Sequence, residues 1–207
     1  MKIIPYIFFI VIFSCVSFAQ KSDLEKANQS LIDGYYNEAV DTYSKIISIN
    51  SNYLPIYYSR GIALLKLKEY QRAIEDFSVI ISKDDTNYNA YVGRAICYRN
   101  IKKYTEGMRD LDKAIKLDST KFEAYYQKAN IHLDQEDDEE ALHYYRLAQR
   151  INTSNEFTIY GQALVFYYAE KNKEAIEYFE KFIEIHQKED QYKIDALRIL
   201  KYLKEED

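Results

Sequence analysis

Apolar, small and polar residues follow one another at helical spacing along most of the chain, most clearly in the stretch from Tyr57 to Asp85. This stretch predicts two amphipathic helices joined by a tight turn at Lys68 and Glu69. Each helix carries a small residue, Gly61 in the first and Ala73 in the second, with large residues on either side. Two helix axes approach closely only where small side chains meet. We therefore expect a helical hairpin whose helices cross at these two positions.

The same arrangement recurs every 34 residues. On the first helix of each hairpin the small residues are Ala27, Gly61, Ala95, Ala129 and Ala163. On the second helix they are Ala39, Ala73, Gly107, Ala141 and Ala175. Four places after each of the latter comes a large apolar or aromatic residue: Tyr43, Phe77, Leu111, Tyr145 and Phe179. A fixed period of this length predicts stacked hairpins, each of which buries its apolar face against the next.

This period resembles the tetratricopeptide repeat, which has an aromatic residue, a Leu-Gly pair, a Tyr, an Ala-x-x-x-Phe pattern and a final Pro. The resemblance covers Gln20 to Glu189 as five repeats, residues 20–53, 54–87, 88–121, 122–155 and 156–189. It implies an all-α fold, a right-handed superhelical solenoid of helical hairpins. The final Pro is absent from every repeat, so polar clusters such as Asn50-Ser51-Asn52 and Asp118-Ser119 are expected to end the helices.

The C-terminal segment, residues 190–207, predicts a last helix from about Gln191 to Lys204. Stacked repeats leave an apolar face at their end, and a half-polar helix commonly covers it. We therefore expect this helix to be a cap. Its apolar side is predicted to consist of Ile194, Leu197, Leu200 and Leu203.

Residues 1–19 have the pattern of a signal peptide, with a positive start, an apolar run from Ile3 to Phe13, and the small residues Ser17 and Ala19 before a cleavage site. The run is shorter than the ~20 residues that span a bilayer as a helix. We expect export to the periplasm or out of the cell. A competing interpretation is an outer-membrane lipoprotein acylated at Cys15. The protein is expected to attach to a membrane only if it is lipidated in this way.

The formal net charge is −5, and no basic stripe runs along the sequence. Nucleic acids are bound mainly by cations that neutralise their phosphates, so this charge argues against a nucleic-acid partner. Of the two cysteines only Cys97 lies beyond the signal-peptide pattern. Because Ile96 and Tyr98 flank it on a predicted helix, we expect it to be buried.

The remaining candidates for chemistry are three histidines and one acidic run. His132, His143 and His186 have no second ligand at the spacing of a metal-binding helix, and His132 is expected to be a hydrogen-bonded core ring. The acidic run, residues 136–140, is expected to begin a helix and cap its N–H groups, with calcium binding as the alternative. No nucleophile elbow or phosphate-binding loop occurs in the sequence. We therefore expect no enzyme activity, no cofactor and no metal.

The resemblance also implies a binding surface, because in tetratricopeptide proteins the first helix of each hairpin lines a concave groove. The matching positions hold mainly Tyr and branched aliphatic residues, which interfaces favour. The residues predicted to contact a partner are Tyr58, Ile62, Leu65, Ile96, Arg99, Tyr126, Asn130, Phe157, Tyr160, Leu164, Tyr167 and Tyr168. A clamp for acidic chaperone tails, known in this family, is not expected, because Leu24 replaces its Lys and its later cations are missing.

The sequence therefore predicts an exported scaffold that binds a peptide segment or a partner protein in its groove. The alternative is a structural subunit or lipoprotein cofactor of a periplasmic or outer-membrane assembly complex. The residues expected to pack the repeats together are Gly61, Ala73, Phe77, Ala95, Ala129, Ala141, Ala163 and Ala175.

Overall fold

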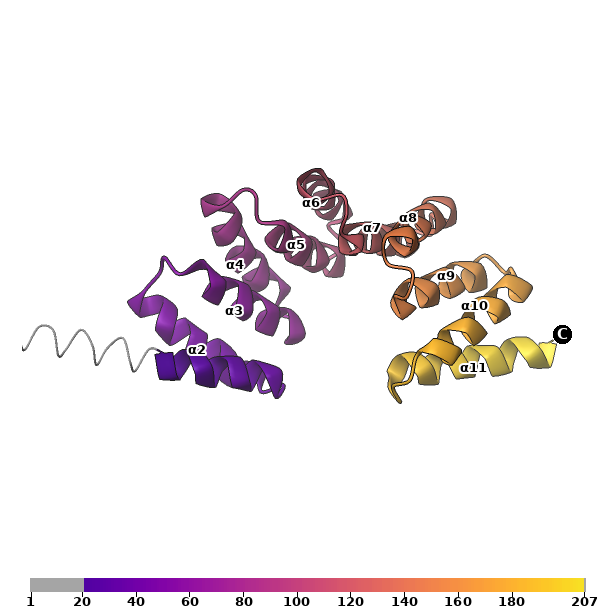
Figure 1. Ribbon diagram of the computed structural model, residues 1–207, viewed down its shortest axis with the longest axis horizontal. Helices are drawn as coiled ribbons and strands as arrows, with labels where there is room; N and C mark the ends of the chain where they lie inside the picture. Colours follow the sequence, from indigo (N-terminus) through magenta and orange to yellow (C-terminus); the bar gives the residue numbers. More distant parts are fainter. Residues whose placement is uncertain (1–20, 207) are drawn as a thin grey trace, which may run out of the picture. The chain divides into compact units, whose positions relative to one another are not determined.

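The computed structural model describes residues 21–206, and the signal-peptide pattern with Cys15 lies outside this range (Figure 1). Residues 21–32 are helical. The helices that follow are α2 (Tyr36–Ile49), α3 (Leu54–Lys66), α4 (Tyr70–Lys83), α5 (Tyr88–Asn100), α6 (Tyr104–Leu117), α7 (Phe122–Asp134), α8 (Asp138–Ile151), α9 (Glu156–Tyr168), α10 (Asn172–Ile185) and α11 (Gln191–Glu206). No strand occurs within the described range. The predicted all-α helical repeat is confirmed.

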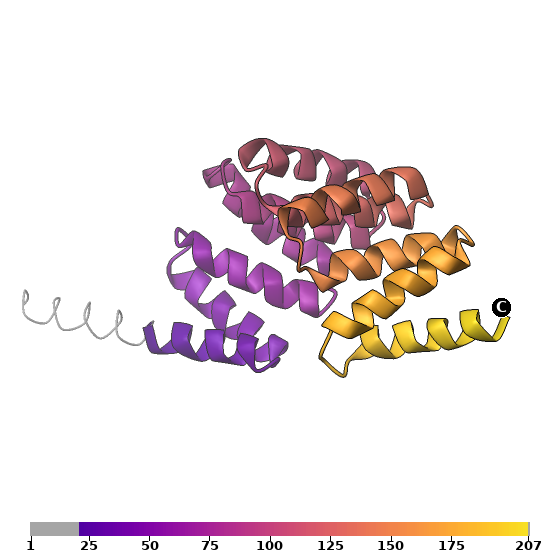
Figure 2. The ribbon, with the colours of Figure 1, turned by 45° about the vertical axis from the view of Figure 1, so that its right-hand side comes forward.

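The described residues form two compact units, one that ends at Ile101 and one that begins at Lys102. The first contains residues 21–32 and α2 to α5, and the second contains α6 to α11. Within each unit, helices that follow one another in the sequence pack side by side, as α3 does on α4 and α9 on α10 (Figures 1 and 2). In the second unit, α11 lies along α10 in both views.

Each hairpin turn places one residue in the left-handed backbone region. These residues, again 34 apart and with φ between 54° and 84°, are Gly34, Lys68, Lys102, Glu136 and Glu170. In the second hairpin the Glu69 N–H donates to the Leu64 oxygen at 2.9 Å, and the Lys68 N–H donates to the Leu65 oxygen at 3.0 Å. This is the Schellman arrangement, which satisfies carbonyl groups at the end of a helix. Backbone hydrogen bonds therefore hold the reversal of the chain, with glycine present only in the first turn.

A polar residue also ends the second helix of each of the first four hairpins: Asn50, Asp84, Asp118 and Asn152. Oδ1 of Asp118 accepts hydrogen bonds from the backbone N–H of Thr120 at 3.0 Å and from its hydroxyl at 2.6 Å. Asp84 binds Thr86 in the same way. These side chains hold the turn that leads out of the helix, so they take over the role of the missing proline as expected.

Aromatic rings pack against glycines where one hairpin meets the next. Phe77 is fully buried, and its ring lies against Gly61 of α3 and Gly93 of α5. A Cβ atom added at Gly93 would come within 2.7 Å of that ring. In the second unit, a Cβ atom at Gly161 of α9 would come within 2.4 Å of the Tyr145 ring. Gly61 belongs to the same hairpin as Phe77, whereas Gly93 and Gly161 belong to the next hairpin, and a larger residue at either of these two would require the ring to shift.

All eight residues expected to pack the repeats together are buried: Gly61, Ala73, Phe77, Ala95, Ala129, Ala141, Ala163 and Ala175. Cys97 is also fully buried, and burial raises the pKa of its thiol to about 12. The prediction of a buried Cys97 is thus confirmed.

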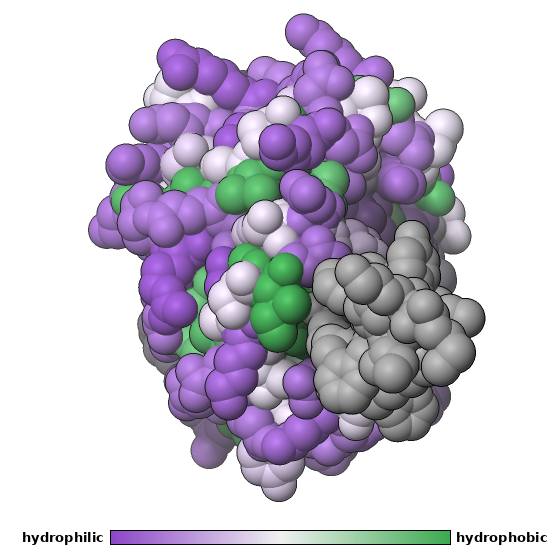
Figure 3. All heavy atoms as spheres, turned by 90° about the vertical axis from the view of Figure 1, so that its left-hand side faces the viewer, coloured by the Kyte–Doolittle hydropathy of each residue, from purple (hydrophilic) through white to green (hydrophobic). Residues whose placement is uncertain are grey.

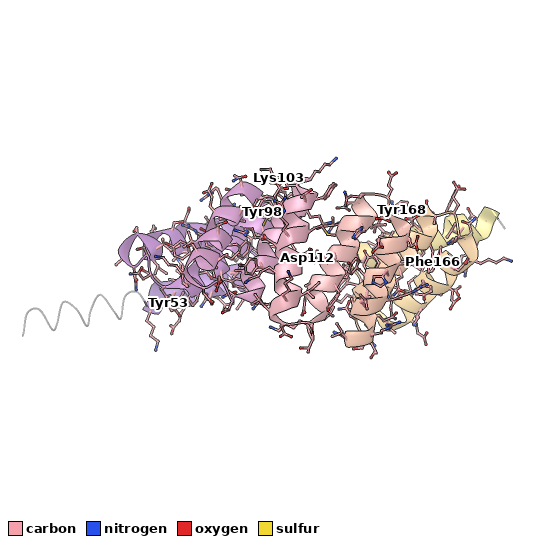
Figure 4. All side chains as sticks on the ribbon, turned by 90° about the horizontal axis from the view of Figure 1, so that it is seen from above. Tyr53, Tyr98, Lys103, Asp112, Phe166 and Tyr168 are labelled. Atoms are coloured by element: carbon pink, nitrogen blue, oxygen red, sulfur yellow. The ribbon has the colours of Figure 1, made fainter. Side chains whose placement is uncertain are left out.

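Three cations at the same 34-residue spacing connect successive repeats: Arg60, Arg94 and Lys128. The guanidinium of Arg60 donates two hydrogen bonds to the carboxylate of Asp76, at 2.6 and 2.9 Å, and one to the Ser44 hydroxyl at 3.0 Å. Arg94 binds the Ser78 hydroxyl at 3.0 Å. Lys128 donates to Asp112, labelled on α6 in Figure 4, at 2.7 Å. Arg94, Lys128 and, through Ser44, Arg60 thus join the first helix of their repeat to the second helix of the preceding one, and Asp76 holds Arg60 within its own repeat.

The last helix covers the end of the second unit with a different side from the one predicted. Ala196, Leu200 and Leu203 are buried against α10, whereas Ile194 is 52% exposed and Leu197 is 48% exposed. The prediction that all four apolar residues face the repeats was wrong for Ile194 and Leu197. The helix carries two apolar stripes, and the stripe with the small residue Ala196 allows the closer approach.

The face drawn in Figure 3 is mostly hydrophilic, with hydrophobic residues in small groups. Among residues 21–206, no helix combines the length and the apolar character needed to cross a membrane.

Candidate partner-binding surface

The predicted groove residues of the first unit lie at the edge of its core. Tyr58 of α3 packs edge-on against Phe77, with the ring centroids 5.8 Å apart, and burial raises the pKa of its hydroxyl. Ile62 and Leu65 follow on the same helix and are partly buried. Ile96 and Arg99 lie on α5 and are also partly buried. Each of these side chains keeps part of its surface exposed.

In the second unit the predicted residues gather on two helices. Tyr126 lies on α7, and α9 carries Phe157, Tyr160, Leu164, Tyr167 and Tyr168. The Tyr126 ring packs on Tyr145 and the Tyr160 ring on Phe179, each with centroids 5.9 Å apart. Residues 126 and 160 are 34 apart, as are residues 145 and 179. The two repeats therefore present equivalent faces of α7 and α9.

Tyr160 lies at the centre of an aromatic cluster formed by three helices. Its ring centroid is 4.9 Å from that of Phe182 in α10 and 5.4 Å from that of Tyr192 in α11. Phe157 also contacts Tyr192, at 5.1 Å. Tyr168, labelled on α9 in Figure 4, is 64% exposed and Tyr192 is 45% exposed. We call the set Tyr126, Phe157, Tyr160, Tyr168 and Tyr192 the tyrosine wall.

The pKa of Tyr160 is raised to about 12, first by burial and then by the negative charge of Asp195, with smaller effects from neighbouring tyrosines. Those tyrosines are Tyr168, Tyr192 and Tyr126. Near neutral pH the Tyr160 hydroxyl keeps its proton, and the wall combines apolar rings with neutral hydroxyl groups.

Sequence reasoning missed Tyr192 and Asp195, because it treated the last helix only as a cap. One further step of 34 residues from Phe157 reaches Gln191, directly before Tyr192. Helix α11 therefore begins like the first helix of another hairpin, and its first turns extend the wall. Continuing the repeat period past Glu189 was the signal that could have identified both residues.

Asn130 differs from the other predicted contact residues because it is only 7% exposed. Its Oδ1 accepts a hydrogen bond from the Tyr145 hydroxyl at 2.6 Å, and its Nδ2 lies 3.3 Å from Oε1 of Gln127. The structure thus gives Asn130 a structural role within its hairpin.

The histidines and the acidic run are engaged in local contacts. His132 stacks on Tyr144 with the centroids 5.4 Å apart, and its Nδ1 lies 3.1 Å from Oδ2 of Asp137. The acidic run was expected to cap the N–H groups of α8, but Asp137 makes no such side-chain hydrogen bond. Its carboxylate contacts His132 instead. His186 is buried, and its Nε2 lies 3.0 Å from Oδ1 of Asp190. Among the described residues no group of three His, Cys, Asp or Glu side chains could hold a metal ion.

The geometry defines a helical-repeat protein, and comparison with known proteins identifies the repeat. Models of the tetratricopeptide repeat match residues 88–121, 122–155 and 158–188. The chain therefore contains tetratricopeptide repeats between residues 88 and 188. A comparison with curated proteins gave no significant match.

Several solved structures share the fold. TTC0263, a thermophilic TPR protein of Thermus thermophilus, is 14% identical with a TM-score of 0.77, over 87% of this chain and 98% of its own. MamA (41-end) from Desulfovibrio magneticus RS-1 is 20% identical with a TM-score of 0.68, over 83% of this chain and 97% of its own. Another crystal structure of MamA is 19% identical with a TM-score of 0.64, over 77% and 93%. At these identities the likeness concerns the fold alone.

The fold supports a protein–protein interaction scaffold, and repeats of this kind are typically non-catalytic. Proteins of this class generally bind other proteins. The tyrosine wall gathers aromatic side chains from α7, α9 and α11 of the second unit.

Proposed function

We propose that this protein is an exported, non-catalytic scaffold that docks a segment of a partner protein on the tyrosine wall. One observation supports this above the others: α9, α10 and α11 contribute aromatic rings to one cluster around Tyr160, and its ring Tyr192 is 45% exposed. Tyr168, at the end of α9, is 64% exposed. Clustered exposed rings mark interaction sites. Tyrosine is favoured there because it offers a large rigid contact area and a hydroxyl.

The test uses the two exposed members of the wall. Tyr160 packs on Phe179 and Phe182, so its truncation would also damage the core. Tyr168→Ala with Tyr192→Ala removes contact area while leaving that packing in place. Buried aromatic hot spots contribute 2 kcal/mol or more, or about thirtyfold in affinity. We expect the double variant to lose the partner that the unchanged protein captures from its native envelope, as identified by mass spectrometry.

The matched control is Tyr35→Ala with Tyr53→Ala, which removes two exposed tyrosines of the first unit. Capture should survive in the control, and both variants should keep the circular dichroism and melting of the unchanged protein. Capture that survives in the wall variant and is lost in the control would contradict the proposal.

Export is the second part of the proposal, and it is supported by the signal-peptide pattern of residues 1–19. N-terminal mass analysis of the protein from its native host tests it. A chain that begins at Gln20 supports export with cleavage. A diacylglyceryl mass on Cys15 supports a lipoprotein instead, and an intact Met1 contradicts both.

A further inference from the structure

The tyrosine wall is bordered by acidic residues. The residues of α7 that correspond to Phe157 and Tyr168, 34 positions earlier, are Glu123 and Asp134, and neither is buried. The equivalent packing of Tyr126 and Tyr160 on the following helices places the two carboxylates on the same face as the rings. An acidic group therefore lies on either side of Tyr126 along α7.

A third carboxylate lies beside Tyr160. Asp195 follows Tyr192 by three residues on α11, about one helical turn, and the Tyr192 ring contacts Tyr160 at 5.4 Å. The charge of Asp195 also helps to raise the pKa of Tyr160. Asp195 accepts a hydrogen bond from Gln191 at 3.0 Å and pairs with Arg198, whose side chain is 70% exposed. Exposed ion pairs contribute little to stability, so a ligand cation can replace Arg198 at small cost.

Among the helices of the wall, α9 carries no Lys or Arg, α7 carries Lys128, which is 7% exposed and pairs with Asp112, and α11 carries Lys193, Arg198, Lys201 and Lys204. On α8, Arg146 and Arg150 line a hollow together with His143, Leu147 and Glu139. The positions of α7 and α9 that were predicted to line the groove, together with the corresponding positions one repeat away, include no Lys or Arg. These residues are Glu123, Tyr126, Asn130, Leu133, Asp134, Phe157, Tyr160, Leu164, Tyr167 and Tyr168. A segment that approaches α7 and α9 thus meets aromatic faces and negative charge, while on α11 Lys193 is paired with Glu189 and Arg198 with Asp195.

We propose that the partner segment is extended and basic, with Lys or Arg side chains between apolar ones. This inference rests on the proposed function and specifies its partner. Cations are attracted to the faces of tyrosine rings and to carboxylates at the rim, while apolar side chains pack between the rings. Three helices spaced about 8–10 Å apart place their outer axes about 16–20 Å from each other, which roughly 5–6 extended residues cross.

The probe is a phage-displayed library of random peptides about 12 residues long, longer than the wall requires. After selection on the purified protein, we expect peptides enriched in Lys and Arg and depleted in Asp and Glu. Their affinity should fall as salt is raised.

A charge variant then tests the rim directly. Glu123→Gln, Asp134→Asn and Asp195→Asn together should weaken the selected peptides about tenfold and flatten their salt dependence. The matched control changes three glutamates of α10, Glu174→Gln, Glu177→Gln and Glu184→Gln, and should leave affinity unchanged.

The outcomes separate this inference from the function on which it rests. Neutral or acidic peptides that are lost on the Tyr168→Ala and Tyr192→Ala variant would leave the docking site standing and overturn its preference for basic segments. Peptides that bind that variant unchanged would overturn the docking site itself. A selection that enriches no peptide at all would count against both.

Discussion

The Tyr145 hydroxyl donates a hydrogen bond to Oδ1 of Asn130 at 2.6 Å inside the fourth hairpin, and Tyr43 binds Asn28 in the same way at 2.7 Å in the first. In both cases the two residues are 15 apart. At the same two positions the other three repeats have an aliphatic residue and a side chain that lacks a hydroxyl: Ile62 and Phe77, Ile96 and Leu111, and Leu164 and Phe179. The two positions thus vary together from repeat to repeat, as expected if a buried hydroxyl requires a partner.

This pairing predicts a non-additive effect on stability. Asn130→Leu leaves the Tyr145 hydroxyl buried without a partner, which should lower the free energy of unfolding by about 1–3 kcal/mol. Adding Tyr145→Phe removes the unpaired hydroxyl and recreates the apolar pair of the fifth hairpin, so it should recover much of that loss. Urea unfolding of both single variants and the double variant gives the coupling energy. Simply additive losses would show that the hydrogen bond contributes nothing.

The period of the sequence was enough to predict the hairpins, because the repeat determines helix length, turn position and the small residues at the crossings together. Ala73 is fully buried, and the residues after Leu67 and Ile101 form turns as expected. Such features depend on local spacing, which is visible in a single sequence.

The period did not predict features that break the repeat. Helix α11 has no following hairpin, so two apolar stripes compete, and packing against α10 selects the one with Ala196. Asn130 occupies a groove position by its number, yet a hydrogen bond to the next helix keeps it buried. Tyr192 joins the wall because its ring contacts Phe157 and Tyr160 of α9, which is a tertiary contact.

The hairpin turns predict a stabilising substitution. Lys68 has a φ of 62°, a conformation that is unfavourable for residues with a Cβ atom. Lys68→Gly should therefore raise the free energy of unfolding by roughly 0.5–1 kcal/mol, after the greater freedom of glycine in the unfolded chain is deducted. The reciprocal change, Gly34→Ala in the first turn, should lower it by a similar amount. Urea midpoints that move in the same direction for the two variants would contradict this account.

The buried thiol predicts a slow chemical reaction. Burial raises the pKa of Cys97 to about 12, and its side chain is fully buried. Only the thiolate attacks thiol reagents, so the folded protein should be almost unreactive near neutral pH. A Cys15→Ser chain, which keeps Cys97 as its one thiol, should react with an aromatic disulfide reagent only after urea unfolds it. Rapid reaction of the folded chain would show that α5 opens or that the thiol is accessible.

Asp190 joins the cap helix to the last hairpin. Its Oδ1 accepts hydrogen bonds from the backbone N–H groups of Tyr192 and Lys193, at 3.1 and 3.3 Å, and lies 3.0 Å from Nε2 of His186. Partial desolvation acts to raise the pKa of Asp190, but the hydrogen bonds from the His186 ring and the two N–H groups outweigh it. The pKa therefore lies below its usual value of 3.8.

A lowered pKa in the folded state means that the ionised carboxylate stabilises the fold. This contribution is present in full above the unfolded-state pKa near 3.9 and is lost as the pH falls through the lower folded-state value. Below about pH 4 we therefore expect the start of α11 to loosen before the core around Phe77, with faster hydrogen exchange at Tyr192 and Lys193. Asp190→Asn keeps an oxygen for the two N–H groups but has no charge to lose. Its α11 exchange rate should depend less on pH over this range, and an unchanged pH dependence would show that other carboxylates hold the cap.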